Sequence, residues 1–350
     1  MNTISYSTRL HIWLQRLVRW EFWSWRIVYL PVAVYWFFLA IKARGWVFFS
    51  AANPCMRFGG LVGYSKSEVD KLIPEDYRPK TIFKETTDSL SDVFYELART
   101  GLSYPLIVKP DQGERGRGVA IIETESDLES VLSKTNERML VQEYANLPME
   151  LGVMYSRHPK EAAGRITSIV VKDFPRVIGD GESTLMELIL NEHRARLSYE
   201  VHVKKFGKRI LSIPKKGEEI QIVTIGNHMR GTTFFNGNHL ISTELETVFD
   251  NLAKQIHGFH IGRFDLKTDS IEELLKGNFV VIELNGVNSE PCHIFHPGRS
   301  IFLAWRDLFK HWKRIADVSI ANHKKGVEYA SYSEIRAEIK RHKAELRQSD

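Results

Sequence analysis

Two apolar stretches that each end in a carboxylate place the strongest constraint on how this chain folds. Within GRFDLKTDSIEELLKGNFVVIELNGVNSEP, residues 262–291, Asp265 accompanies the first stretch, and Glu283 and Asn285 close the second. Side chains two residues apart in a strand share a face, so Glu283 and Asn285 point the same way. A short helix in DSIEELLKG returns the chain to the strand of Asp265. We therefore expect three oxygen donors to converge from two neighbouring strands.

The expected cluster has the composition of a magnesium site. Mg²⁺ is held by one or two carboxylates together with substrate phosphates and water. Without a cation, two acids beside the apolar run FVVI would repel each other and be costly to bury. The competing interpretation is an ordinary pair of surface strands.

A lysine and a glycine-rich loop upstream add an element that suits phosphate. In YPLIVKPDQGERGRGVAII, residues 104–122, Lys109 ends a strand, and Gly113, Gly116 and Gly118 relax the turn that follows. Backbone N–H groups of such a loop approach phosphate oxygens closely, while a lysine supplies a point charge. The loop lacks the full GxxxxGK[ST] and GxGxxG patterns, so taken alone it is more often a simple turn.

Helix and strand patterns mix irregularly along the rest of the chain. A helix begins near Ser65, where Ser65 and Glu68 have capping-box spacing. Further helical patterns cover 88–100, 125–135, 184–194, 244–257 and 300–320, and strand-like runs cover 45–54, 105–110, 118–124, 139–144, 166–171, 209–214, 219–225 and 279–284. Strands often come in adjacent pairs, which predicts an α+β enzyme built on antiparallel sheets. The charged segment 329–350 is typical of a solvated surface helix.

The first fifty residues are typical of a chain that meets a membrane. A helix over 8–20 sets apolar residues at helical spacing against a cationic side: Leu10, Trp13, Leu14 and Leu17 against Arg9, Arg16 and Arg19. The uncharged run IVYLPVAVYWFFLAI, residues 27–41, follows and is rich in Trp and Tyr, which settle at headgroup depth. As a helix this run spans roughly 22 Å, short of the roughly 30 Å hydrocarbon core.

We therefore expect a monotopic anchor that attaches a cytoplasmic protein to the inner face of a membrane. The alternatives are a buried helical hairpin or oligomer contact, and a tilted single span. A signal peptide fits less well, because the apolar run is unusually aromatic.

Composition narrows the choice of partners only in part. Lys and Arg number 48 against 43 Asp and Glu, and the isoelectric point near 9.0 favours anionic partners. The basic residues are scattered and do not interleave with aromatic ones, which argues against nucleic acid. Cys55 and Cys292 have no CxxC or zinc-type spacing, and the pairs HGFH and HIFH lack further ligands, so neither a disulfide scaffold nor a zinc site is expected.

Taken in chain order, these motifs resemble the ATP-grasp ligases, most closely the D-alanyl-D-alanine ligase type, over roughly residues 60–300. In that family a metal motif consists of an arginine two residues before an aspartate and a Glu-x-Asn at the end of the next strand. The residues that match it are Arg263, Asp265, Glu283 and Asn285. The strand lysine before the family's glycine-rich lid is similar to Lys109 with Gly113, Gly116 and Gly118, and a second phosphate-binding lysine is similar to Lys66.

The adenine hinge of the family has two acids seven residues apart, one near the adenine amino group and one on the ribose hydroxyls. Glu143 and Glu150 have this spacing, and the backbone from Tyr144 to Asn146 is similar to the edge that meets adenine.

The resemblance implies two α+β lobes with antiparallel sheets that grip ATP, and a ligase in which a carboxylate attacks the γ-phosphate before an amine displaces phosphate from the acyl phosphate. It implies ATP and Mg²⁺ or Mn²⁺ as cofactors, with Arg263 and Lys109 on the transferring phosphoryl group. The loop GVNSEPCHIFHPG departs from the short turn of the dipeptide ligases, and the insert 177–233 looks like one found in ligases that make glutathione or cyanophycin, so D-alanine is not the expected substrate. Substrate-side candidates are Arg230, Asn288, Ser289, Glu290 and His293.

The expected organisation has five parts. These are membrane-associating helices over 1–50, a truncated segment over 51–80, a small lobe with the phosphate loop and hinge over 81–150, a large lobe with the metal site over 151–300, and C-terminal helices over 301–350. A phosphotransferase and a non-catalytic ATP-binding membrane scaffold remain alternative functions. An amphiphilic acid or amine would suit the anchor, and the sequence leaves the oligomeric state open.

Overall fold

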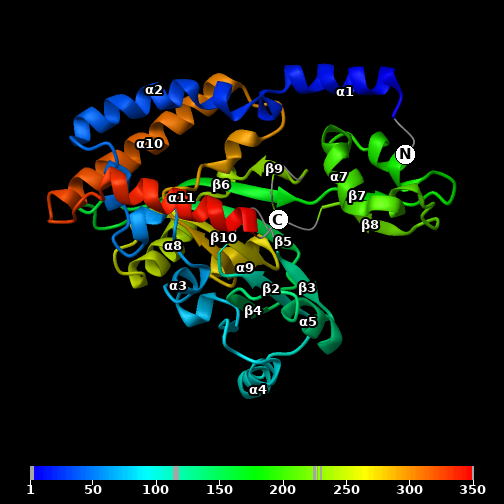
Figure 1. Ribbon diagram of the computed structural model, residues 1–350. Helices are drawn as coiled ribbons and strands as arrows, with labels where there is room; N and C mark the ends of the chain where they lie inside the picture. The colour runs from blue at the N-terminus through cyan, green and yellow to red at the C-terminus, as the bar shows by residue number, and fades with distance from the viewer. Residues whose placement is uncertain (1–3, 113–117, 224–225, 227, 229–230, 349–350) are drawn as a thin grey trace.

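The computed structural model describes residues 4–112, 118–223, 226, 228 and 231–348, and Figure 1 shows how they are arranged. The small lobe is a four-stranded antiparallel sheet in the order β1-β4-β2-β3. Its strands are β1 (Thr81–Lys84), β2 (Leu106–Pro110), β3 (Ala120–Ile122) and β4 (Met139–Glu143). Helices α4 (Leu90–Thr100) and α5 (Glu125–Leu132) pack against this sheet, and each begins with a capping box.

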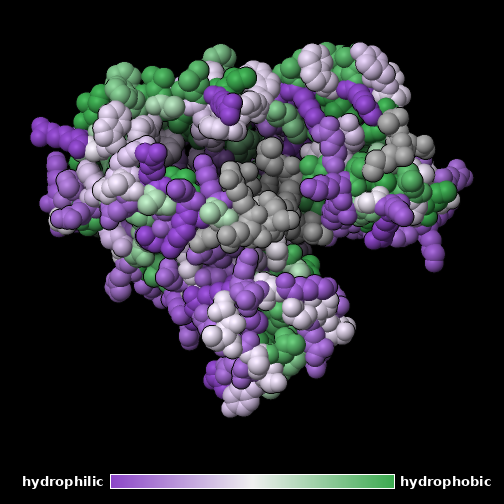
Figure 2. Space-filling view, viewed as in Figure 1, coloured by the Kyte–Doolittle hydropathy of each residue, from purple (hydrophilic) through white to green (hydrophobic). Residues whose placement is uncertain are grey.

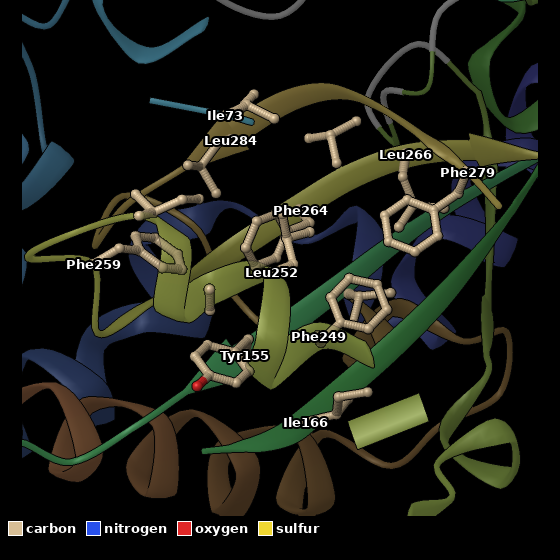
Figure 3. Close-up of a cluster of buried hydrophobic side chains, with 14 of the residues drawn as sticks. Ile73, Tyr155, Ile166, Phe249, Leu252, Phe259, Phe264, Leu266, Phe279 and Leu284 are labelled. Atoms are coloured by element: carbon tan, nitrogen blue, oxygen red, sulfur yellow. The ribbon is translucent and has the colours of Figure 1, made fainter. Parts of the chain in front are cut away.

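The large lobe is a five-stranded antiparallel sheet in the order β11-β10-β5-β6-β9. Its strands are β5 (Met149–Ser156), β6 (Arg165–Asp173), β9 (Thr233–Asn236), β10 (Ile261–Thr268) and β11 (Val280–Asn285). Helices α8 (Thr243–Gln255) and α9 (Ile271–Lys276) bury their apolar sides against it. Figure 3 shows this core, in which the rings of Phe249 and Phe279 stack with centroids 5.2 Å apart. The predicted α+β fold with antiparallel sheets is confirmed.

Helices from both ends of the chain cover the large lobe. Figure 1 shows α2 (Trp25–Ala43) and α10 (Ile301–His323) side by side above the large sheet, with α1 (Tyr6–Val18) continuing along the same side. Residues of α2, α10 and α11 (Tyr332–Gln348) share one apolar cluster with Phe48 and Ile261. The apolar helices predicted near the N-terminus are therefore present, and the second of them packs on the folded domain.

A small insert forms a separate apolar cluster beside the large sheet. It holds the hairpin of β7 (Arg176–Ile178) and β8 (Glu219–Gln221) together with α6 (Leu185–Asn191) and α7 (Tyr199–Phe206). The short helix α3 (Lys66–Asp70) precedes β1 in the chain and begins with the predicted capping box of Ser65 and Glu68.

Three local predictions are wrong. Residues 45–54 contain a 3-10 helix, Phe48–Ala51, because Phe48 and Phe49 are both buried whereas a strand would bury only one of two neighbours. Half of the run 209–214 lies in the 3-10 helix Gly207–Leu211, and among the described strands none pairs with the run. The C-terminal helix is not simply solvated, because α11 buries Ile335 and Glu338.

Asn53 holds the segment after α2 onto the large sheet. Its side chain is fully buried, with Nδ2 donating to the carbonyls of Gly59 and Ile261 at 3.0 and 2.8 Å. Its Oδ1 accepts from the N–H groups of His260 and Ile261 at 2.9 and 3.0 Å. One amide thus satisfies three backbone groups at the start of β10 and a fourth at Gly59.

We expect Asn53→Ala to lower the free energy of unfolding by about 3 kcal/mol, since each buried backbone group left unpaired costs about 1–3 kcal/mol. Chemical denaturation followed by circular dichroism measures the change. Asn251→Ala, on an exposed position of α8, is the matched control and should stay within about 0.5 kcal/mol of the wild type. Equal effects of the two substitutions would contradict this role of Asn53.

Candidate nucleotide and metal site

Strand β10 sets the predicted nucleotide and metal residues in a row. Arg263, Asp265 and Lys267 alternate onto one face, and the first and last lie about 13 Å apart along the strand. Across the sheet, Asp265 pairs with Glu283 of β11, and Lys267 pairs with Glu150 of β5. The row therefore connects residues assigned to the metal with residues assigned to the nucleotide.

The three predicted metal donors lie together. Asn285 Nδ2 donates to Asp265 Oδ2 at 3.0 Å, and Glu283 stands opposite Asp265 with its side chain exposed. The helix predicted between the strands is α9, which returns the chain as expected. Within the described residues no three His, Cys, Asp or Glu side chains form a metal-binding group, so two acids and an amide are the available set. Such a set fits Mg²⁺ only when phosphate oxygens and water complete the shell.

An irregularity in the sheet connects this cluster to the small lobe. The register shifts after Asp265, which leaves Ile282 without a partner on β10. The carbonyl of Ile282 accepts from Lys109 Nζ at 3.3 Å. Burial lowers the pKa of Lys109, and Glu283 and Asp70 oppose that effect. Lys109 thus reaches from β2 of the small lobe to the predicted metal donors of the large lobe.

Arg263 and Asp265 form a buried ion pair. Arg263 donates from Nε and Nη2 to the Asp265 carboxylate at 3.1 and 2.9 Å. Burial raises the pKa of Asp265, but the charges of Arg263 and Lys172 outweigh it and bring the pKa to about 2. Asp265 is therefore a carboxylate over the whole physiological range.

Lys172 is a residue of this site that sequence reasoning missed. It lies on β6, and its Nζ is 2.8 Å from Glu150 Oε1 and 3.0 Å from Asp265 Oδ1. All three side chains are buried. Burial lowers the pKa of Lys172, but the two carboxylates outweigh it and raise the pKa above its ordinary value. The predicted strand 166–171 stops one residue before it, and only the pairing of β6 with β5 brings Lys172 to these acids.

Lys66 lies at the end of β2. It opens α3, its Nζ donates to the carbonyl of Pro110 at 3.0 Å, and its N–H donates to the carbonyl of Asp111 at 3.0 Å. The side chain of Asp111 in turn accepts from the N–H of Ser67 at 2.7 Å. This places both predicted phosphate-binding lysines, Lys66 and Lys109, at the end of β2.

The predicted hinge connects the two lobes. Glu143 ends β4 with an exposed side chain, and Lys267 of β10 donates to the carbonyl of Ala145 at 3.1 Å. Lys267 Nζ also lies 5.0 Å from the ring centre of Tyr144, and Asn146 is exposed. Glu150 is 7% exposed, and its carboxylate accepts a hydrogen bond from Lys172. A ribose hydroxyl bound to Glu150 would therefore donate to a carboxylate that Lys172 also contacts.

The remaining predicted residues fall into three groups. Gly113, Gly116 and Arg230 lie outside the described residues, and Gly118 has a positive φ of 69° that favours glycine. Ser289 and His293 are buried with internal partners, since Ser289 Oγ bonds Gly286 and the ring of His293 bonds Ser168 and Asp307. Asn288 and Glu290 lie on the loop after β11, where Asn288 Nδ2 donates to Tyr64 Oη at 2.8 Å.

Part of the chain is similar in sequence to a known domain and to two curated proteins. A model of the RimK-like ATP-grasp domain matches residues 77–151, the stretch that forms the small lobe. The cyanophycin synthetase of Geminocystis herdmanii is 25% identical over 231 residues, which cover 59% of this chain and 25% of that protein. That of Crocosphaera subtropica is 26% identical over 236 residues, which cover 61% of this chain and 25% of that protein. The chain therefore spans about a quarter of the length of the curated relatives it matches.

Two solved structures illustrate the similarity in shape. The D-alanine–D-alanine ligase of Bacillus anthracis aligns with a TM-score of 0.44 at 15% identity, over 75% of this chain and 69% of that one. A bifunctional glutathione synthetase of Pasteurella multocida aligns with a TM-score of 0.38 at 17% identity, over 70% of this chain and 36% of that one.

We expect Lys172→Met to lower the free energy of unfolding by about 3 kcal/mol, because removing one partner of a buried ion pair leaves the opposite charge uncompensated. In the variant, Mg²⁺ should bind the carboxylates of Glu150 and Asp265 and restore part of the lost free energy of unfolding. It should therefore raise the Tm of the variant more than that of the wild type. Thermal denaturation with and without Mg²⁺ measures both effects. Lys276→Met, whose exposed ion pair with Glu273 contributes little, is the control. An equal Mg²⁺ shift in all three proteins would contradict the idea.

Proposed function

We propose that the chain is an ATP- and Mg²⁺-dependent ligase that joins a carboxylate to an amine through an acyl phosphate, because residues 77–151 match a model of the RimK-like ATP-grasp domain. The synthetase names of its curated relatives support this proposal, and their greater length leaves the substrates open.

The observation that carries the proposal is the meeting of two lobes at one group of charges. Lys109 and Lys66 come from the end of β2 in the small lobe, and Asp265, Glu283 and Asn285 come from the large sheet. Cations on one side and metal donors on the other are what the triphosphate of a nucleotide requires. Arg263 lies beside this group. A site that only binds ATP does not need an arginine next to the transferred phosphoryl group, so Arg263 favours a catalytic site over a binding scaffold.

Each residue then has a defined task in the proposed reaction. Asp265, Glu283 and Asn285 would hold Mg²⁺, and the ion would supply positive charge to the phosphates. Lys109, Lys66 and Arg263 offset the negative charge that develops as the substrate carboxylate attacks the γ-phosphorus and ADP leaves. The amine then attacks the acyl carbon, and phosphate departs. No protein nucleophile is needed.

We expect Glu283→Gln to weaken Mg²⁺-dependent ATP binding at least about tenfold, because one metal-binding carboxylate becomes a neutral amide. Titration calorimetry of the detergent-purified protein measures this, with Glu272→Gln on the exposed face of α9 as the control.

In the wild type, ATP, Mg²⁺ and a panel of carboxylates should yield a hydroxamate with hydroxylamine, since hydroxylamine traps an acyl phosphate. A stable phosphoester in place of the hydroxamate would identify a phosphotransferase, and no ATP binding by the folded wild type would refute the site.

We further propose that the ligase works at a membrane surface. The exposed faces of α1 and α2 carry large apolar side chains, among them Trp13, Leu14, Leu30 and Phe38. Figure 2 shows apolar residues along the upper edge of the molecule, where Figure 1 places α1 and α2. Among the described helices, α2 is the one long and apolar enough to cross a membrane, but its buried side packs on α10. This packing favours an anchor that lies in the interface over a helix that spans the bilayer.

The charges around this apolar surface suit anionic lipid. Residues 1–46 contain six Lys and Arg and a single acid, Glu21, which is buried. Cations beside an exposed apolar face are attracted to acidic headgroups, at about 1 kcal/mol for each residue near the surface.

We expect Leu30→Glu to reduce binding to vesicles of phosphatidylserine and phosphatidylcholine at least about tenfold, because burying one leucine contributes about 1.5–3 kcal/mol. Flotation of the vesicles in a density gradient measures the bound fraction. Tyr95→Glu is a matched control, since Tyr95 of α4 is 68% exposed and Leu30 is 64% exposed. Equal retention of both variants would rule out the α2 face as the membrane contact.

A further inference from the structure

The loop after β11 holds Glu290 in a fixed position beside the site. This loop, residues 286–291, bonds the carbonyls of Gly59 and Gly60 through two of its N–H groups. The ring of His311 on α10 hydrogen-bonds the carbonyl just before Glu290 at 3.0 Å, and Arg263 Nη1 donates to the Glu290 carbonyl at 3.4 Å. Three separate elements therefore fix the backbone that carries this side chain.

Whereas its backbone is held by hydrogen bonds, the carboxylate of Glu290 has no hydrogen bond and no ion pair among the described residues, although it is only partly exposed. Burial raises the pKa of Glu290 to about 7. The ionisable groups around this loop are Arg263 and Asp265 on β10, Lys172 on β6, Cys292 and His311. Arg263 is already committed to Asp265 and to Cys292 Sγ, so Glu290 is left without a counter-charge.

The position of Glu290 along the site indicates what it meets. On β10, Lys267 contacts the hinge expected to hold adenine, Asp265 belongs to the metal cluster, and Arg263 comes last. Glu290 lies at the Arg263 end, on the far side of the metal cluster from the hinge. In the proposed reaction this end is where the acyl group lies and where the amine must approach it.

We propose, on the premise that the chain is a carboxylate–amine ligase, that Glu290 binds the protonated amine substrate and accepts its proton. An ammonium group has no lone pair and does not attack an acyl carbon. Glu290 takes one proton from the ammonium, and the free amine forms the C–N bond while the C–O bond to phosphate breaks. The second proton of the nitrogen leaves with phosphate as hydrogen phosphate, and Glu290 returns its proton to solvent. A half-buried, unpaired carboxylate attracts the cationic amine and accepts a proton near neutral pH.

The test separates the two nucleophiles that the acyl phosphate meets. Hydroxylamine is neutral at neutral pH and needs no base, whereas amino acids and ethanolamine are protonated there. With a carboxylate that gives hydroxamate in the wild type, Glu290→Gln should still form hydroxamate at near the wild-type rate. Its rate of amide formation should fall roughly 10²-fold at neutral pH. The rate should recover above about pH 9, where free amine becomes abundant.

Two outcomes would overturn the role of Glu290. Equal loss of hydroxamate and amide would show that Glu290 acts on ATP, on the carboxylate or on folding. Unchanged amide formation with an unchanged pH profile would show that it does not act on the amine. A wild type that makes no hydroxamate with any carboxylate counts against the proposed ligase and not against Glu290, so the two failures are distinct.

A second measurement needs no substrate. Carbon NMR of protein labelled at the glutamate carboxyl groups, compared with Glu290→Gln, identifies the Glu290 signal and follows its titration. A midpoint near 7 agrees with the proposal, and a midpoint near 4.5 overturns it. Adding ethanolamine should lower the midpoint in the wild type, because a bound ammonium stabilises the carboxylate.

Discussion

The buried carboxylate of Asp265 is the constraint around which the rest of the site is arranged. Taking an ionised carboxyl group out of water costs several kcal/mol unless cations and hydrogen bonds replace the lost hydration. Here Arg263, Lys172 and Asn285 supply that replacement from three strands. The strand order β11-β10-β5-β6 therefore decides which side chains reach Asp265. Asn285 comes from β11, Arg263 from β10 and Lys172 from β6. A sheet that paired in another register would leave this charge unsatisfied.

Polar contacts join the two lobes at the site. The apolar clusters of the small and large sheets are separate within the described part of the chain. Between the lobes, Lys109 donates to the backbone carbonyl of Ile282, and Lys267 donates to that of Ala145. Carbonyl oxygens are weak partners for a lysine compared with phosphate. A polyanion between the lobes would therefore compete for the same ammonium groups, which connects nucleotide binding with the relative position of the lobes.

Sequence patterns predict this site as far as its chemistry is local. Arg263 and Asp265, or Glu283 and Asn285, share a strand face by spacing alone, and α9 is short enough to bring the two pairs together. Lys172 and the register shift at Ile282 arise from pairing between distant strands, which no local pattern records. The 3-10 helix at Phe48–Ala51 was missed for a related reason, since its two phenylalanines are buried by α10 and α2 from afar. Spacing likewise predicted an amphipathic α1 but did not tell which of its sides faces the protein.

Helix α1 leaves most of its large apolar side chains exposed. Arg16 donates to the carbonyl of Leu197 in the insert, while Trp13, Leu14 and Leu17 are left exposed. Just beyond α1, Glu21 pairs with Arg194 at 2.7 Å in a buried contact that fixes this segment to the insert. Of the α1 side chains only Ile12 is buried, and leaving the larger apolar side chains of a helix in contact with water is unfavourable. The same arrangement is favourable at the surface of a bilayer, where the apolar side is buried in lipid.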